Sequence, residues 1–116
     1  MKIIRFEDLI AWQKAQDLAV LIYGFFQQSK EYGFKDQIFR ASVSVSSNVA
    51  EGFERSSDAD FSRFLFISKG SNSEVKSMLY LAKRLNFITD NDLQFGLSRC
   101  DEIGKILNGL LNALKK

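Results

Sequence analysis

Histidine and proline are missing from this chain of 116 residues, and Cys100 is its only cysteine. Without histidine the chain lacks the commonest general base and the commonest metal ligand, and one thiolate is too few for a zinc site. A single cysteine cannot form an internal disulfide and favours a reducing compartment, so we expect a cytoplasmic protein. The acidic residues also form no Glu-x-x-His pattern of the di-iron kind. We therefore expect neither an enzyme, nor a metal site, nor a cofactor.

Long hydrophobic runs are missing as well. The longest, residues 18–26, has nine residues, whereas a bilayer-spanning helix needs about 20. Glu7 and Asp8 interrupt the position where a secretory signal would need its apolar centre. We expect the run to be buried within protein and to have no role in a membrane.

Apolar residues make up 46% of the chain, and the length suits one domain covering residues 1–116. With no proline and only seven glycines, long helices meet few breakers. Helical periodicity is visible over about residues 6–29, 34–54, 57–86 and 90–115. Short connections between these segments predict an all-α, antiparallel up-and-down four-helix bundle.

Two of these segments raise questions. In the second, Val43 and Val45 alternate with serines as in a strand, but a longer helical stripe contains Ile38, Ala41, Val45, Val49, Gly52 and Phe53. The longer pattern favours helix, with Val43 outside the apolar face. The second half of the first segment is apolar on nearly every side, so it must be covered from more than one direction, most simply by a second subunit.

A polar stripe adjoins the apolar face of the second segment: Gln37, Arg40, Ser44, Asn48, Glu51 and Arg55. One interpretation is a hydrogen-bond network at a helix or subunit interface, in which Arg40 pairs with Glu51 or with a neighbour's acid. The other is a surface that meets phosphates or bases through Arg40, Asn48 and Arg55. The structural interpretation is favoured, because polar groups beside a core are usually satisfied within the protein.

The net charge is only +2, but positive charge is concentrated in the third segment. Residues 61–89 hold one acid, Glu74, against five basic residues: Arg63, Lys69, Lys76, Lys83 and Arg84. The lysines recur every seven residues and so form a near-axial row about 21 Å long at 1.5 Å per residue. This row either binds a polyanion or consists of lysines that flank the core and reach solvent.

Two other patterns favour structural roles. KGSNSE at residues 69–74 lacks the order of a phosphate-binding loop and predicts a close helix crossing. Phe25, Phe26, Phe64 and Phe66 are expected in the core or at an interface, although phenylalanines can also stack on bases.

The run QIFRASVSVSSNVAEG at residues 37–52 resembles the signature of the 23S rRNA intervening-sequence protein family, also called the four-helix bundle protein family. FEDLIAWQKA at residues 6–15 and KGSNSE match as well, so the resemblance covers nearly the whole chain. The chain departs from the family pattern at Ser46, where relatives often have proline, and at Phe39, where they often have a second arginine. A further proline that relatives carry before the second helix is also missing.

This resemblance implies an antiparallel four-helix bundle that assembles into a ring-like homopentamer, in bacteria and without known catalytic activity. A related family member, the accessory variability protein of diversity-generating retroelements, is a basic pentameric barrel that binds nucleic acid and a reverse transcriptase. The leading hypothesis is therefore a non-enzymatic, nucleic-acid-associated homopentamer that binds RNA or DNA electrostatically and can dock a second protein. The alternative is a protein-interaction scaffold with no nucleic-acid role, which the low net charge and Phe39 favour.

Overall fold

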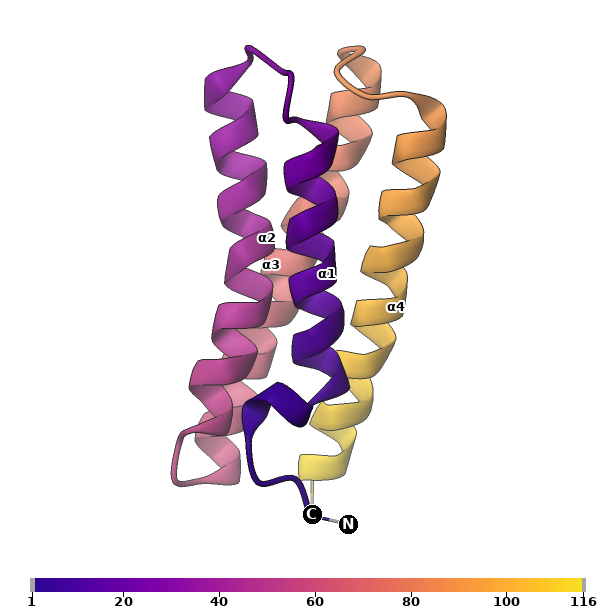
Figure 1. Ribbon diagram of the computed structural model, residues 1–116. Helices are drawn as coiled ribbons and strands as arrows, with labels where there is room; N and C mark the ends of the chain where they lie inside the picture. The colour runs from indigo at the N-terminus through magenta and orange to yellow at the C-terminus, as the bar shows by residue number, and fades with distance from the viewer. Residues whose placement is uncertain (1, 116) are drawn as a thin grey trace.

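The computed structural model describes residues 2–115, which form a bundle of four α-helices measuring 45 × 21 × 20 Å. The helices are α1 (Ile10–Phe25), α2 (Tyr32–Phe53), α3 (Asp58–Arg84) and α4 (Asp90–Leu114), preceded by the 3-10 turn η1 (Phe6–Asp8). Successive helices run in opposite directions, and α4 returns to lie beside α1 (Figure 1). The described residues contain no strand, so the predicted all-α bundle is confirmed. Met1 and Lys116, the ends of the predicted domain, lie outside the described residues.

The first helix is shorter than the predicted range of 6–29. Leu9 adopts an extended backbone conformation (φ −73°, ψ 125°) and buries its side chain, so η1 and α1 are separate elements. The ring of Phe6 packs edge-on against Trp12, with 5.3 Å between ring centroids, and this holds the turn against the bundle. At the other end α1 stops at Phe25, because Phe26 leaves helical geometry and enters the core.

Side-chain caps begin the last two helices. The Ser57 hydroxyl accepts a hydrogen bond from the backbone N–H of Asp60 at 3.1 Å, as expected for the start of α3. Thr89 and Asp92 form a reciprocal capping box at the start of α4. In the connection between α3 and α4, Asn86 has a positive φ of 63°. This conformation terminates a helix, and asparagine tolerates it well. These local signals place the short connection that reverses the chain between α3 and α4.

The serine-rich part of α2 is helical throughout. Val45 and Val49 are fully buried, whereas Val43 is exposed, as the helical stripe predicts. Gly52 lies against α3, where an added Cβ would stand 2.6 Å from Cβ of Phe64, so the two helices approach closely there. Phe53, expected in the core, is only half-buried because it is the last residue of α2, although its ring packs edge-on against Phe61.

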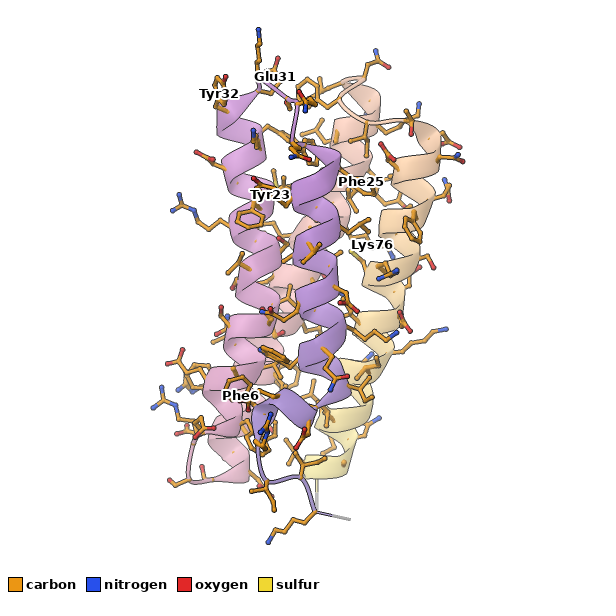
Figure 2. All side chains as sticks on the ribbon, in the orientation of Figure 1. Phe6, Tyr23, Phe25, Glu31, Tyr32 and Lys76 are labelled. Atoms are coloured by element: carbon orange, nitrogen blue, oxygen red, sulfur yellow. The ribbon has the colours of Figure 1, made fainter. Side chains whose placement is uncertain are left out.

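The exposed side of α1 keeps apolar side chains at the surface. Val20 is 71% exposed and Tyr23 55% exposed, and the Tyr23 ring lies beside α2, where it packs edge-on against Phe39 (Figure 2). Together with Ala19 and Val43 they line a shallow groove of about 310 Å³ between α1 and α2. None of the helices in the described chain combines the length and apolar character needed to cross a membrane.

Candidate nucleic-acid interface

The polar stripe of α2 lies along its contact with α3. The hydroxyls of Ser44 and Ser71 are 2.9 Å apart, and the Asn48 side-chain amide donates hydrogen bonds to both the backbone oxygen and the hydroxyl of Ser44. Nearer the other end, the Gln37 amide donates to Glu74 of α3 at 3.4 Å. Gln37 and Ser44 of the stripe therefore join α2 to α3 within one subunit, whereas Asn48 bonds within α2.

The two arginines of the stripe have different environments. Arg55 forms an ion pair with Glu51 at 2.9 Å. Of the two partners expected for Arg40, Glu51 is therefore wrong, because Arg55 is one helical turn from Glu51 and Arg40 is about three turns away; the pair with a neighbour's acid stays a prediction. Arg55 and Arg63 of α3 both place their guanidinium groups over the ring of Phe64, at 4.7 and 4.6 Å from its centroid. Arg40 forms no ion pair with any residue from 2 to 115.

The predicted lysine row follows the side of α3 that faces α4, and all three lysines are half-buried. Lys76 donates a hydrogen bond of 2.7 Å to Asp101 of α4. In Figure 2 the Lys76 side chain lies next to α4. The hydrogen bond to Asp101 raises the pKa of Lys76 above its ordinary value of 10.5. Lys69, Lys83 and the neighbouring Arg84 form no ion pair within the described chain. The row thus contains unpaired cations at both ends and a neutralised pair in the middle.

Exposed aromatic rings accompany these cations. Phe66 is 60% exposed and Tyr80 49% exposed on α3, and the Lys69 ammonium lies 6.0 Å from the centroid of the Phe66 ring. Phe66, predicted in the core or at an interface, lies outside the core of the described chain, because its neighbours Phe64 and Leu65 take the buried side of the helix. Its place at an interface stays a prediction. We define the basic face of α3 as the five cations and two exposed rings: Arg63, Phe66, Lys69, Lys76, Tyr80, Lys83 and Arg84.

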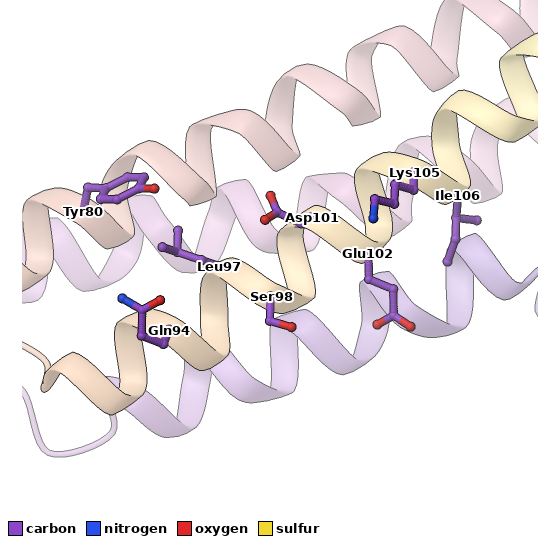
Figure 3. Close-up of a pocket in the computed structure, with 8 residues that line it drawn as sticks. All are labelled: Tyr80, Gln94, Leu97, Ser98, Asp101, Glu102, Lys105 and Ile106. Carbon is purple, nitrogen blue, oxygen red and sulfur yellow. The ribbon is translucent and has the colours of Figure 1, made fainter.

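Two hollows follow the contact between α3 and α4. The larger, about 910 Å³, is an open depression whose lining residues come mainly from α4, with Tyr80 contributed by α3 (Figure 3). Its charged residues are Asp101, Glu102 and Lys105, so it does not suit an anion. The smaller, about 360 Å³, is called the Asn72 groove here and is lined by Lys69, Asn72, Ser73, Lys76, Cys100, Asp101, Gly104, Lys105 and Asn108. Three lysines against one acid favour an anion in this groove.

Cys100 lies between the helices and is a poor nucleophile. Burial is the main reason that the pKa of its thiol is raised, to about 12, and the nearby carboxylate of Asp101 adds to the effect. The thiol therefore stays protonated at neutral pH. Among residues 2–115, no group of three or more cysteine, aspartate or glutamate side chains gathers in an arrangement that would hold a metal ion.

Sequence reasoning missed Asn72 and Lys105. Asn72 is 6% exposed, and its amide nitrogen donates to the backbone oxygen of Cys100 at 2.9 Å. Its side-chain oxygen, Oδ1, is buried without a hydrogen-bond partner in the described chain. Helical periodicity puts Asn72 on the same side of α3 as Leu65, Val75 and Leu79. A polar residue at such a position is the signal that could have identified it. Lys105 gave no such signal, because only the tertiary contact brings α4 beside the lysine row.

A family model and a solved structure relate this chain to the same kind of protein. Residues 7–109 match the model of the family described as 23S rRNA-intervening sequence protein. A crystal structure of a protein of unknown function from the S23 ribosomal protein family of Bacteroides thetaiotaomicron VPI-5482 is similar, with a TM-score of 0.82 and 28% identity. The match covers 88% of this chain and 98% of that one. No curated protein matches the chain. Since the family model spans most of the bundle, including the α2 stripe and the basic face, this chain belongs to the 23S rRNA-intervening sequence protein family.

Proposed function

We propose that this protein is a non-enzymatic, homopentameric assembly protein that binds RNA or DNA through the basic face of α3. The observation that carries the proposal is the unpaired charge on this face: Lys69, Lys83 and Arg84 have no acidic partner in the described chain. Between Phe61 and Arg84 the only acid of α3 is Glu74, which accepts a hydrogen bond from α2. Asp60, in the first turn of α3, pairs with Arg63 at 3.6 Å. The part of the face from Lys69 to Arg84 therefore offers most of the free cations to a polyanion.

The exposed rings give this face a second means of contact. Lysine and arginine neutralise phosphates without regard to sequence, whereas aromatic rings stack on unpaired bases. Phe66 and Tyr80 are half a helix apart along α3 and are both exposed near lysines. This combination favours single-stranded nucleic acid, whose bases are free to stack, over a closed duplex.

A homopentamer would repeat the basic face five times. Five weak sites on one particle raise the apparent affinity for a long strand through avidity. The apolar groove of α1 and α2, with Val20 and Tyr23 at its rim, supports burial against a second copy, because exposed apolar side chains of this kind gather at interfaces. Light scattering at micromolar concentration tests the assembly: we expect five times the 13.2 kDa chain mass, and a monomer would contradict it.

Binding of a fluorescent single strand at several salt concentrations tests the nucleic-acid proposal. We expect the logarithm of the affinity to fall linearly with the logarithm of the salt concentration, by about 0.7 for each phosphate contacted. Replacing Lys69, Lys83 and Arg84 with alanine should weaken binding and reduce this slope by about 2. The control replaces Lys2, Lys30 and Lys115 with alanine, which removes the same charge away from α3. Equal losses in the two triple variants, or an affinity independent of salt, would refute the assignment to α3.

A protein-interaction scaffold is the second candidate, and exposed apolar side chains favour it. Ile67 and Leu81 of α3, and Leu85 directly after it, are each more than 40% exposed. Undetectable binding of mixed RNA and DNA strands at low salt, by a protein of the expected assembled mass, would favour the scaffold.

A further inference from the structure

The Asn72 groove contains a buried acceptor that the fold leaves without a donor. Asn72 is fixed in orientation, because its Nδ2 atom donates to the backbone oxygen of Cys100 at 2.9 Å. Turning the amide over would bring two oxygens together, so Oδ1 must be the atom without a partner. A buried acceptor that lacks a donor costs about 1–3 kcal/mol. A ligand that displaces the side chains covering Oδ1 and brings a donor to it therefore gains affinity here.

The lysines around the groove define the rest of the ligand. Lys76 is already paired with Asp101. Lys69 and Lys105 also line the groove, one from α3 and one from α4, and neither forms an ion pair within residues 2–115. Ser73 and Asn108 add neutral hydrogen-bonding groups to the lining. The groove thus suits an anion that also carries a hydroxyl donor, and its volume of about 360 Å³ is in the range of small-ligand sites.

We propose that the Asn72 groove binds a ribose phosphate unit of RNA, with the phosphate between Lys69 and Lys105 and the 2′-hydroxyl donating to Oδ1 of Asn72. The 2′-hydroxyl is the group by which proteins tell RNA from DNA. This inference rests on the proposed function and narrows its substrate class to RNA. The two surfaces share Lys69 and Lys76: the basic face attracts any strand, and the groove beside it selects the sugar.

Three strands of one sequence, each about 12 nucleotides long, test the sugar preference. They are RNA, its 2′-O-methyl form, and DNA with uracil in place of thymine, so that the bases are identical. We expect RNA to bind roughly threefold to tenfold more tightly than either of the others, which is the value of one hydrogen bond. Methylation keeps the oxygen, removes the donor and adds one methyl group. Equal affinities for RNA and its 2′-O-methyl form would therefore refute the contact with Asn72.

Two glycines of α4 provide a matched pair of variants. An added Cβ at Gly104 would lie in ordinary contact with Nδ2 of Asn72, at 3.8 Å, whereas at Gly109 it would meet no atom within 4 Å. Gly104→Leu should fill the groove and abolish the preference for RNA, while Gly109→Leu should leave it unchanged. Circular dichroism verifies that both variants fold. Loss of the preference in both variants, or in neither, would contradict the location of the site.

Free nucleotides separate the groove from the basic face. In NMR titrations, a ribonucleoside monophosphate should shift the amide signals of groove residues more than a deoxyribonucleoside monophosphate or inorganic phosphate does. Salt-dependent binding of RNA and DNA with equal affinity would overturn this inference and leave the proposed function standing. No binding of any strand, with the ribonucleotide effect intact, would overturn the proposed function alone. The absence of both would overturn both.

Discussion

The contact of α3 with α2 differs from its contact with α4 in two ways: in how closely the helices approach, and in whether the buried polar groups have hydrogen-bond partners. Toward α2, Gly52 lets the helices meet at Phe64, and the buried Ser68 hydroxyl donates to the backbone oxygen of Val45 at 2.6 Å. Toward α4, the helices are close at Gly96, where an added Cβ would stand 2.7 Å from a Leu79 methyl group. Beside Asn72 they leave a groove lined by lysines and an unpaired acceptor.

Side-chain size explains this difference. Serine and glycine allow two backbones to approach and to satisfy each other's polar groups over short distances. Lysine and asparagine are longer, so the backbones stay apart and their polar groups depend on one another or on a ligand. The contact between α2 and α3 is therefore built for stability, and the contact between α3 and α4 has a surface that is available for binding.

Alkaline pH should cause the largest loss of stability. The reason is Cys100 of α4, an ionisable thiol that is buried between α4 and α3. The fold raises the pKa of Cys100 from 9.0 to about 12, so its stabilising contribution is complete below pH 9 and declines as the pH rises toward 12. The free energy of unfolding should fall by up to roughly 1.4 kcal/mol per pH unit in this range. Urea titrations at successive pH values measure it. A Cys100→Ala variant should show a shallower decline, and an identical decline would contradict the explanation.

Substitution of glycine should give the next largest effect. Gly52→Ala places a methyl group against Phe64 and the Phe61 ring, so we expect the free energy of unfolding to fall by about 1–3 kcal/mol. Gly70 lies in the middle of α3 with no atom within 4 Å of an added Cβ. Gly70→Ala should therefore raise stability by about 0.5–1 kcal/mol through helix propensity. Urea denaturation measures both variants, and a stabilising Gly52→Ala would show that α2 and α3 are not in tight contact there.

The smallest changes in stability should come from replacing the buried polar side chains Ser68 and Asn72, and the two changes should differ in sign. Ser68→Ala removes a hydrogen bond that the fold uses, so we expect a loss of about 1 kcal/mol. Asn72→Leu removes one hydrogen bond and also an acceptor that the fold leaves unpaired, so stability should change by less than about 1 kcal/mol and can increase. Thermal unfolding of both variants tests the contrast. A loss at Asn72 equal to or larger than that at Ser68 would show that the amide is fully satisfied in solution.

Periodicity predicted the buried faces well where a helix has one apolar side. In α4 helical spacing puts Leu97, Ile103 and Leu107 within one arc of the helix, and all three are buried. In α2 the same spacing separates the exposed Val43 from the buried Val45. It worked less well for α1. The apolar character of that segment hid the break at Leu9, which depends on backbone geometry and on the packing of Phe6 against Trp12.

The sequence predicted only part of the candidate site. The seven-residue spacing of Lys69, Lys76 and Lys83 correctly indicates that they share one side of α3, because it depends on one helix alone. Which of these lysines keeps its charge free depends on α4, where Asp101 neutralises Lys76 and Lys105 adds a further cation. No spacing rule relates residues of two helices whose relative register is set by packing.

The sequence by itself determined the four-helix architecture, since helical periodicity, missing proline and the caps at Ser57 and Thr89 are local properties. It also determined the family, through a motif that follows one helix. Only the tertiary structure decided which polar groups are satisfied: Ser44 with Ser71, Arg55 and Arg63 with Phe64, and Asn72 with one partner fewer than it can bind. The physical reason is that a hydrogen bond requires its two atoms within about 3 Å, and between helices that distance is set by the packing of the whole bundle.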